Sequence, residues 1–150
     1  MNILIVGIGK IGEALTKDLL SRGHNIVVIE KDESIAQRIA EEYDKILVIA
    51  GDGCDPLRLE DAKIGRAQIV AAVTGDDEDN LIISQLAKEI YKVPRVIARV
   101  NNPRNEETFK ALGIDGVSAT TIITKLIEEE ATVGDLVTLL TLKRGKISIL

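Results

Sequence analysis

A glycine-rich fingerprint near the N-terminus constrains the fold of this chain more than any other feature. The segment Gly7-Ile8-Gly9-Lys10-Ile11-Gly12 matches the pattern G-x-G-x-x-G, and it follows the apolar run Ile3–Val6 and opens an amphipathic stretch. In such a context the first glycine allows a tight turn, the second lets the backbone approach a pyrophosphate, and the third lets a helix pack closely on the strand. The amides and dipole of the helix N-terminus favour phosphate. The pattern therefore predicts a strand, turn and helix that bind a nucleotide.

The rest of the chain alternates short β-branched runs with amphipathic stretches, which is the pattern of βαβ units in a parallel sheet covered on both faces. Strands are expected at Asn2–Gly7, Asn25–Glu30, Ile46–Ala50, Gln68–Ala72, Arg95–Arg99 and Gly116–Ser118. Helices are expected at Lys10–Arg22, Glu33–Tyr43, Pro56–Asp61, Asp77–Tyr91 and Arg104–Leu112. This alternation predicts an α/β domain at residues 1–118, with a Rossmann-type, doubly wound parallel sheet of six strands in the order 3-2-1-4-5-6.

Composition and charge argue against several classes of function. The 150 residues include 19 Lys and Arg against 24 Asp and Glu, which gives a net charge of −5, and no basic cluster stands beside aromatic residues. This balance argues against nucleic acid as a partner. The apolar runs are far shorter than the roughly 20 residues of a membrane-spanning helix, and the N-terminus has no secretory signal. The chain is therefore expected in the cytoplasm.

Glu30 ends the second expected strand, 18 residues after Gly12. An acid at about this separation accepts hydrogen bonds from the adenosine ribose hydroxyls and repels a 2′-phosphate. The position favours NAD over NADP, although the adjacent Lys31 would soften the exclusion. The alternative reading, an acid that caps the next helix, fits Asp32 better than Glu30.

Two more loops follow strands at the same edge of the expected sheet. Gly51-Asp52-Gly53 follows the third strand, where Asp52 either accepts a hydrogen bond from the adenine amino group or serves as a turn or N-cap residue. Val73-Thr74-Gly75-Asp76 follows the fourth strand, at the crevice where the strand order reverses and the second half of a dinucleotide lies. Thr74 and its backbone are expected to face the nicotinamide-side ribose.

The pair Ala98-Arg99 ends the fifth strand at the same crevice. A guanidinium at this place serves either a phosphate of the ligand or an ion pair with the acidic run Asp77–Asp79. The residues alone leave both roles open.

The sequence shows no evident catalytic group and no metal-ligand cluster. His24, the sole histidine, lies in the turn before the second strand, at the end of the sheet opposite the crevice. A hydride-transfer enzyme normally needs an acid or base near the nicotinamide. Cys54, the sole cysteine, has no companion thiol or base in a motif, so it is expected to be a packing residue.

Beyond Ser118 the pattern leaves the sheet. Residues Ala119–Glu130 have apolar side chains at helical spacing, and Val133–Leu142 form a second such stretch. Six strands already complete the sheet, so the apolar faces of these helices need another partner. Residues 143–150 look like the start of a strand cut off before its sheet, which indicates a fragment of a longer protein; the alternative is a natural short chain that ends in an edge strand.

Together these segments resemble one family, the regulatory subunits of Trk/Ktr-type potassium uptake systems, whose N-terminal domain is called TrkA-N, KTN or RCK. The glycine fingerprint is shared with many enzymes, but three ordered blocks are more specific, namely G-D-x-x-D-P, V-T-x-D-D-E-x-N and A-R-x-x-x-P. This chain carries them as "GDGCDP", "VTGDDEDN" and "ARVNNP". The resemblance runs from Asn2 to about Glu130.

The resemblance implies a cytoplasmic domain that binds NAD(H), and in some members ATP or ADP. It implies ligand contacts at the glycine loop, at Glu30 and at the loops of Asp52 and Thr74, and it gives Arg99 a phosphate contact. The family's crossover helix matches Ala119–Glu130 and would join two copies. The family's hinge helix matches the second helical stretch, which completes residues 119–142. Residues 143–150 would begin a truncated C-terminal domain.

The implied function is regulatory rather than chemical. Homodimers, and rings of dimers, would lie at the inner face of the cell membrane under a membrane-embedded potassium transporter subunit, and the nucleotide would change the angle between paired lobes. Two other classes stay open. An NAD-dependent dehydrogenase would need a catalytic residue from a further segment. A methyltransferase using S-adenosylmethionine also has acids after the second and third strands, at the positions of Glu30 and Asp52. Its glycine loop usually lacks a third glycine like Gly12, and a phosphate site at Arg99 would have no purpose.

Overall fold

The computed structural model describes residues 1–130. Its elements are β1 (Asn2–Val6), α1 (Lys10–Ser21), β2 (Asn25–Glu30), α2 (Glu33–Glu42), β3 (Leu47–Ala50), α3 (Pro56–Asp61), the 3-10 turn η1 (Ile64–Arg66), β4 (Ile69–Ala72), α4 (Asp77–Gln85), the π-helical turn η2 (Leu86–Ile90), β5 (Arg95–Arg99), the 3-10 turn η3 (Pro103–Asn105), α5 (Glu106–Ala111), β6 (Asp115–Val117) and α6 (Ala119–Glu130). The helix expected at Val133–Leu142 and the segment 143–150 lie outside the described residues.

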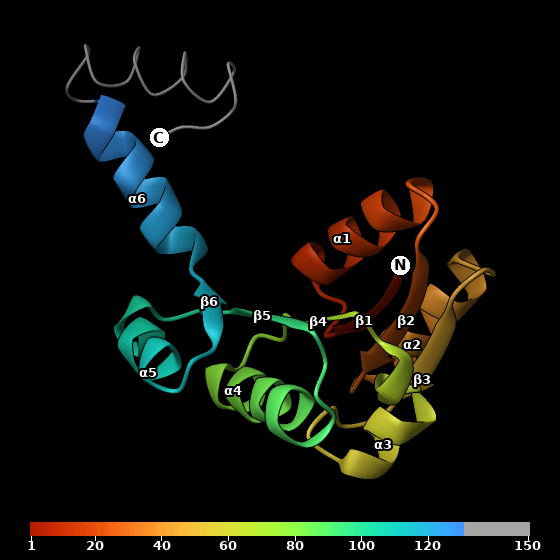
Figure 1. Cartoon of the computed structure of the whole chain (residues 1–150). Coiled ribbons are helices and arrows are strands. Elements are labelled where there is room, and N and C mark those ends of the chain that lie inside the picture. Colours follow the sequence, from red (N-terminus) through yellow and green to blue (C-terminus); the bar gives the residue numbers. More distant parts are fainter. Residues whose placement is uncertain (131–150) are drawn as a thin grey trace.

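The six strands form one parallel sheet in the order β3-β2-β1-β4-β5-β6 (Figure 1). In the centre of the sheet, Ile3 of β1 lies opposite Ile26 of β2 on one side and Ile69 of β4 on the other. The chain therefore winds outward from β1 to β3 and then crosses back to β4, which confirms the predicted Rossmann-type topology. The strand order reverses between β1 and β4, and a doubly wound sheet opens a crevice beyond the carboxyl ends of such strands.

Alternate side chains of the strands fill two apolar cores, one on each face of the sheet. Ile3 and Ile5 of β1 belong to the core shared with α1 and α2, whereas Leu4 and Val6 belong to the core under α3, α4 and α5. All four of these side chains are buried. Because both faces are covered, the central strands are continuously apolar rather than alternating.

The helix starts follow the expected capping chemistry. The Asp32 carboxylate accepts from the amides of Ser34 and Ile35 at the start of α2. Asp76 caps α4 in the same way, through the amide of Asp79 at 3.0 Å. Both bonds satisfy amides that have no partner within the helix, so they fix where the loops after β2 and β4 end.

Most predicted elements begin or end one or two residues from the observed bounds, and the helix expected at Asp77–Tyr91 is divided into α4 and the π-helical turn η2. A 3-10 turn precedes α5 where one helix was expected from Arg104, because the Asn102 side chain accepts from the Arg104 amide and tightens the turn. The last strand ends at Val117 instead of Ser118. The hydroxyl of Ser118 accepts from the Thr121 amide at 3.2 Å and begins α6.

Helix α6 leaves the end of β6 and extends away from the sheet (Figure 1). None of its side chains is buried. Four of its apolar residues are exposed, namely Ile122, Ile123, Leu126 and Ile127. Within residues 1–130, no helix is long and apolar enough to cross a membrane.

Candidate functional site

A pocket of about 330 Å³ lies beyond the carboxyl ends of the central strands. The loops after β1, β2, β3 and β4 line it, together with the end of β5. The predicted site residues that line it are Gly7, Ile8, Gly9, Glu30, Gly51, Asp52, Gly53, Val73, Thr74, Gly75 and Arg99. Segments distant in the sequence thus meet where the strand order reverses.

The glycine loop is shaped by two very close approaches. Gly7 has a φ of +97°, and a Cβ added there would lie 2.8 Å from the Thr74 backbone. A Cβ on Gly12 would lie 2.0 Å from the carbonyl oxygen of Gly7. Only glycine fits at either place, because real Cβ atoms do not come closer than about 3 Å to a backbone atom. Gly12 is buried and holds α1 against the turn, which is the packing role expected of the third glycine.

The N-terminus of α1 lies beside this loop and is available to an anion. Gly9 occupies the N-cap position and makes no side-chain cap, so the first amides of the helix have no side-chain acceptor there. A Cβ added at Gly9 would meet no atom within 4 Å, because this residue borders open space. Free amides and the helix dipole at a pocket wall are suited to a phosphate.

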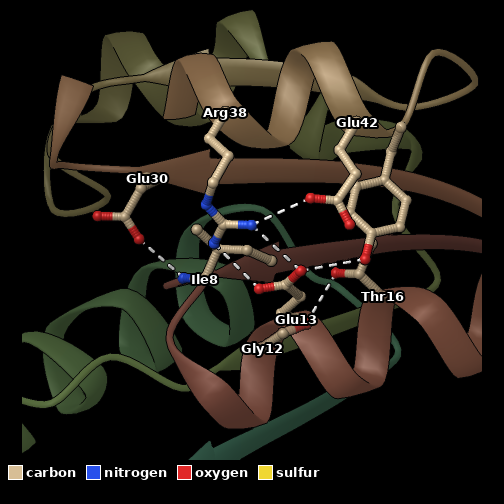
Figure 2. A network of polar contacts seen from close by, with 8 residues as sticks. Ile8, Gly12, Glu13, Thr16, Glu30, Arg38 and Glu42 are labelled. Carbon is tan, nitrogen blue, oxygen red and sulfur yellow. Dashed lines mark hydrogen bonds and ion pairs between the residues drawn. The ribbon is translucent and has the colours of Figure 1, made fainter. Parts of the chain in front are cut away.

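Glu30 is held by two backbone amides. Its Oε1 accepts from the Ile8 amide at 2.8 Å (Figure 2). Its Oε2 accepts from the Asp32 amide, also at 2.8 Å. The carboxylate therefore joins the glycine loop to the loop after β2 and points toward the pocket wall with further lone pairs unused. Lys31, which follows it, is exposed and also lines the pocket.

An ion-paired group behind the glycine loop connects α1 to α2. Arg38 of α2 contacts Glu13 of α1 at 3.0 Å and Glu42 at 3.1 Å (Figure 2). The hydroxyl of Tyr43 donates to Glu13 at 3.1 Å. The hydrogen bond from Arg38 is the main cause that lowers the pKa of Glu13 below its ordinary value. The group therefore braces α1 against α2 without entering the pocket.

The loop after β3 closes on itself around Asp52. The Asp52 carboxylate accepts from the Cys54 amide at 2.9 Å, which is the turn geometry considered for it, and it also lines the pocket. Burial, with the nearby carboxylates of Asp79 and Asp52, raises the pKa of the Cys54 thiol to about 12. Cys54 packs against the core, and a protonated, partly buried thiol is a poor nucleophile.

Arg99 reaches the pocket from the end of β5. It is half-buried, and within residues 1–130 it forms none of the observed ion pairs. Of the acidic residues considered as its partner, Asp77 is engaged elsewhere, since its carboxylate accepts from the amides of Asn101 and Asn102, whereas Asp79 lines the same pocket without an ion pair to Arg99. The guanidinium is thus available to a ligand anion.

Five predicted residues do not line this pocket. Gly12 packs behind the loop, Asp76 caps α4, and Lys10 is exposed on the first turn of α1. Ile11 and Ala98 face a second, almost wholly apolar cavity of about 310 Å³ between α1, β5 and α6. Sequence reasoning also missed several pocket residues, and the main ones are Lys31, Ile35, Asp79 and Ile83.

The second cavity, here called the α6 groove, shares a wall with the pocket. Val73 and Arg99 line both spaces. The rest of the groove is formed by Ile11, Leu15, Ile97, Ala98, Val117, Ala119, Ile122 and Ile123. A ligand that moves the Arg99 side chain therefore changes the surface that the groove presents.

The sequence of this chain is similar to proteins of potassium uptake. The profile of the TrkA-N domain matches residues 3–120. The Trk system potassium uptake protein TrkA of Mycobacterium tuberculosis (strain ATCC 25618 / H37Rv) is 39% identical over 153 aligned residues, which cover 99% of this chain and 68% of that protein.

Two solved structures share the fold. A GsuK channel bound to NAD is 28% identical, with a TM-score of 0.68, and the match covers 77% of this chain and 21% of that one. GsuK bound to ADP is also 28% identical, with a TM-score of 0.70, over 81% of this chain and 32% of that one. The present chain thus spans a small part of each GsuK chain.

Proposed function

Because this chain belongs to the TrkA-N domain family, we propose that it is a nucleotide-binding regulatory domain that controls a potassium transporter. The ligand is NAD(H), or ADP and ATP, and it binds in the pocket at the ends of β1 and β4. The partner is a membrane-embedded potassium transporter subunit, and the domain works at the inner face of the membrane. The names of the TrkA relative and of the GsuK channels bound to NAD and ADP support this assignment.

The observation that carries the ligand assignment is the arrangement of Glu30 opposite a free helix N-terminus. The α1 N-terminus and Arg99 supply hydrogen-bond donors for a pyrophosphate. Two hydrogen bonds from backbone amides hold the Glu30 carboxylate where it can accept from the ribose hydroxyls. The carboxylate disfavours a 2′-phosphate, so NAD is preferred to NADP. Asp52 completes the pocket wall beside the adenine, and the loop of Val73 and Thr74 completes the distal wall, beside the second ribose of a dinucleotide.

The mode of action is conformational, and the protein does not turn over the nucleotide. Two copies pair through Ala119–Glu130, whose apolar side chains are exposed in the single chain. Val73 and Arg99 connect the pocket to the α6 groove. A ligand shifts such an assembly only through unequal affinity for its two states, and about 5.5 kcal/mol of difference moves the population from 1:99 to 99:1.

Calorimetric titration of the purified chain tests the ligand. NAD, NADH, ADP, ATP and S-adenosylmethionine are each titrated into the wild type, Glu30→Ala and Arg99→Ala. We expect binding of the adenine nucleotides, weakened in both variants, with no consumption of NAD. Binding of S-adenosylmethionine alone, or substrate-dependent reduction of NAD, would refute the regulatory assignment in favour of a methyltransferase or a dehydrogenase.

Sedimentation of two matched variants tests the pairing. Ile127 on α6 and Leu57 on α3 are each 61% exposed, so either can be changed to Glu without disturbing a core. Ile127→Glu should convert dimers to monomers because a charge enters the apolar contact, and Leu57→Glu should leave the dimer intact. Equal masses for both variants would exclude pairing through α6.

A further inference from the structure

Asn80, in the first turns of α4, is a fully buried polar residue with all its hydrogen bonds made inside the protein. Its Oδ1 accepts from the amide and the hydroxyl of Thr74 at 3.0 and 2.6 Å, and its Nδ2 donates to the Thr74 carbonyl at 3.0 Å. The side chain thus pairs with Thr74 as a neighbouring strand would. Nδ2 also donates to the carbonyl of Arg99 at 2.9 Å.

The bond to Arg99 fills a gap in the sheet. β4 pairs with β5 only as far as Ala72, which lies opposite Ala98, and the chain then turns away at Val73. Arg99 is the next residue of β5, so it has no strand partner on that side. The Asn80 amide supplies the hydrogen bond that a longer β4 would have made, and a buried carbonyl needs one.

Asp77 secures the loop on the other side of Arg99. Its Oδ1 accepts from the backbone and side-chain amides of Asn101 at 2.6 and 2.9 Å, and its Oδ2 from the Asn102 amide and the Asn105 side chain at 2.9 and 2.8 Å. Partial burial alone would raise the pKa of Asp77, but these four bonds outweigh it and lower the pKa below the ordinary value. The carboxylate is therefore ionised at neutral pH and holds the chain directly after Arg99.

We propose that Asn80 and Asp77 are positioning residues for nucleotide recognition, which fix the main chain of Arg99 so that its guanidinium meets a phosphate of the ligand. The role rests on the proposed nucleotide-binding function. Neither residue lines the pocket, so neither contacts the ligand. Asn80 also holds Thr74, which we assign to the distal wall of the pocket, so the effect on ADP passes through Arg99 and concerns ligands that carry phosphate rather than the nucleoside part.

A double-mutant cycle on ADP and adenosine binding tests this role. The purified chain is compared as wild type, Asn80→Ala, Asp77→Ala and Arg99→Ala, and as the double variants of each positioning residue with Arg99→Ala, by calorimetry with displacement for weak binding. We expect each positioning variant to bind ADP roughly tenfold more weakly, with adenosine changed less than about twofold. In the Arg99→Ala background, the positioning substitutions should cause no further loss of ADP affinity. Substitutions that act through the same residue are not additive.

Ser84→Ala is the matched control. Ser84 lies on the same helix and is also fully buried, and its hydroxyl has no hydrogen-bond partner within residues 1–130. It should leave the ADP affinity at the wild-type value. If Asn80→Ala does not fold, Asp77→Ala carries the test alone, since it leaves Asn80 in place.

The outcomes separate this role from the proposed function. Equal losses for ADP and adenosine, or additive losses with Arg99→Ala, would overturn the positioning role while leaving nucleotide binding intact. A wild type that binds neither ligand would overturn the proposed function and this role together.

Discussion

A methyl group added at Gly12 tests the closest approach in the nucleotide loop. The new Cβ would lie 2.0 Å from the carbonyl oxygen of Gly7, which is a backbone atom, so α1 and the turn after β1 must move apart. Overpacking of this kind costs roughly 1–3 kcal/mol, and the better helix propensity of Ala returns up to about 1 kcal/mol. Because no flexible side chain can yield, we expect a net loss of about 2 kcal/mol, which lowers Tm by roughly 4–8 °C.

Gly9→Ala is the control within the same loop. A Cβ at Gly9 meets no atom within 4 Å, so the substitution costs only the poorer N-cap preference of Ala, about 1 kcal/mol or less. Gly9 nevertheless lines the pocket, and the methyl group occupies space that a pyrophosphate needs. We therefore expect Gly9→Ala to lower Tm less than Gly12→Ala does while losing affinity for NAD, whereas Gly12→Ala loses both stability and affinity.

Circular dichroism during heating, without and with NAD, measures both effects in a chain that has no tryptophan. At a fixed ligand concentration, a ligand that binds only the folded state raises Tm by an amount that grows with the logarithm of its affinity. Gly12→Ala with the Tm of the wild type would show that helix and strand are not locked at this contact. Equal destabilisation by the two substitutions would show that the loop tolerates no side chain at all, and the assignment of separate roles to the two glycines would fail.

Three further predictions concern charge and reactivity. Glu30→Gln should lower the ratio of NAD to NADP affinity by about tenfold, because a neutral amide no longer repels a 2′-phosphate, and an unchanged ratio in calorimetry would contradict that role. Arg38→Met should lower the free energy of unfolding by less than about 1 kcal/mol at pH 7, since both side chains of the Arg38–Glu13 ion pair are partly exposed. The lowered pKa of Glu13 contributes stability that is present above its unfolded pKa and lost as pH falls through the folded pKa. The urea unfolding curves of the variant and the wild type should therefore converge in acid. A difference in stability that stays constant with pH would exclude the Arg38–Glu13 ion pair as the source of that difference. Cys54, with a pKa of about 12, should react with iodoacetamide at pH 8 at least about 100-fold more slowly in the folded chain than in urea, and equal rates would contradict its packing role.

The sheet could be predicted because a parallel sheet covered on both faces leaves a clear pattern. Runs such as Ile3–Val6 are apolar at every position, and in the structure neighbouring residues of β1 enter opposite cores. The glycine fingerprint then orders the first strand, turn and helix by steric necessity, as the contact of Gly12 with Gly7 demonstrates. The strand order followed from the alternation of six strands with crossover helices, which is typical of a doubly wound sheet.

The site could be predicted only where a residue stands next to a strand end. Glu30 and Arg99 end strands, so the topology alone places them at the crevice. Asp79 and Ile83 reach the pocket from one face of α4, and the direction of that face depends on how the helix packs on the sheet. Ala98 precedes Arg99 by one residue, and because successive strand residues point to opposite faces, it is buried in the core with Ile83 and Phe109 and does not line the pocket.

The distribution of fixed and free groups around Arg99 indicates how a nucleotide could act at a distance. Its main chain is tied to α4 through Asn80, while its side chain lies in the wall between the pocket and the α6 groove. Under the proposed function, the hydrogen bond from Asn80 opposes a shift of β5 when a phosphate draws the guanidinium toward the pocket, so we expect the change to reach the groove surface. A loosely held strand would absorb more of the ligand's binding energy locally, so we expect the support at Arg99 to matter for regulation as well as for affinity.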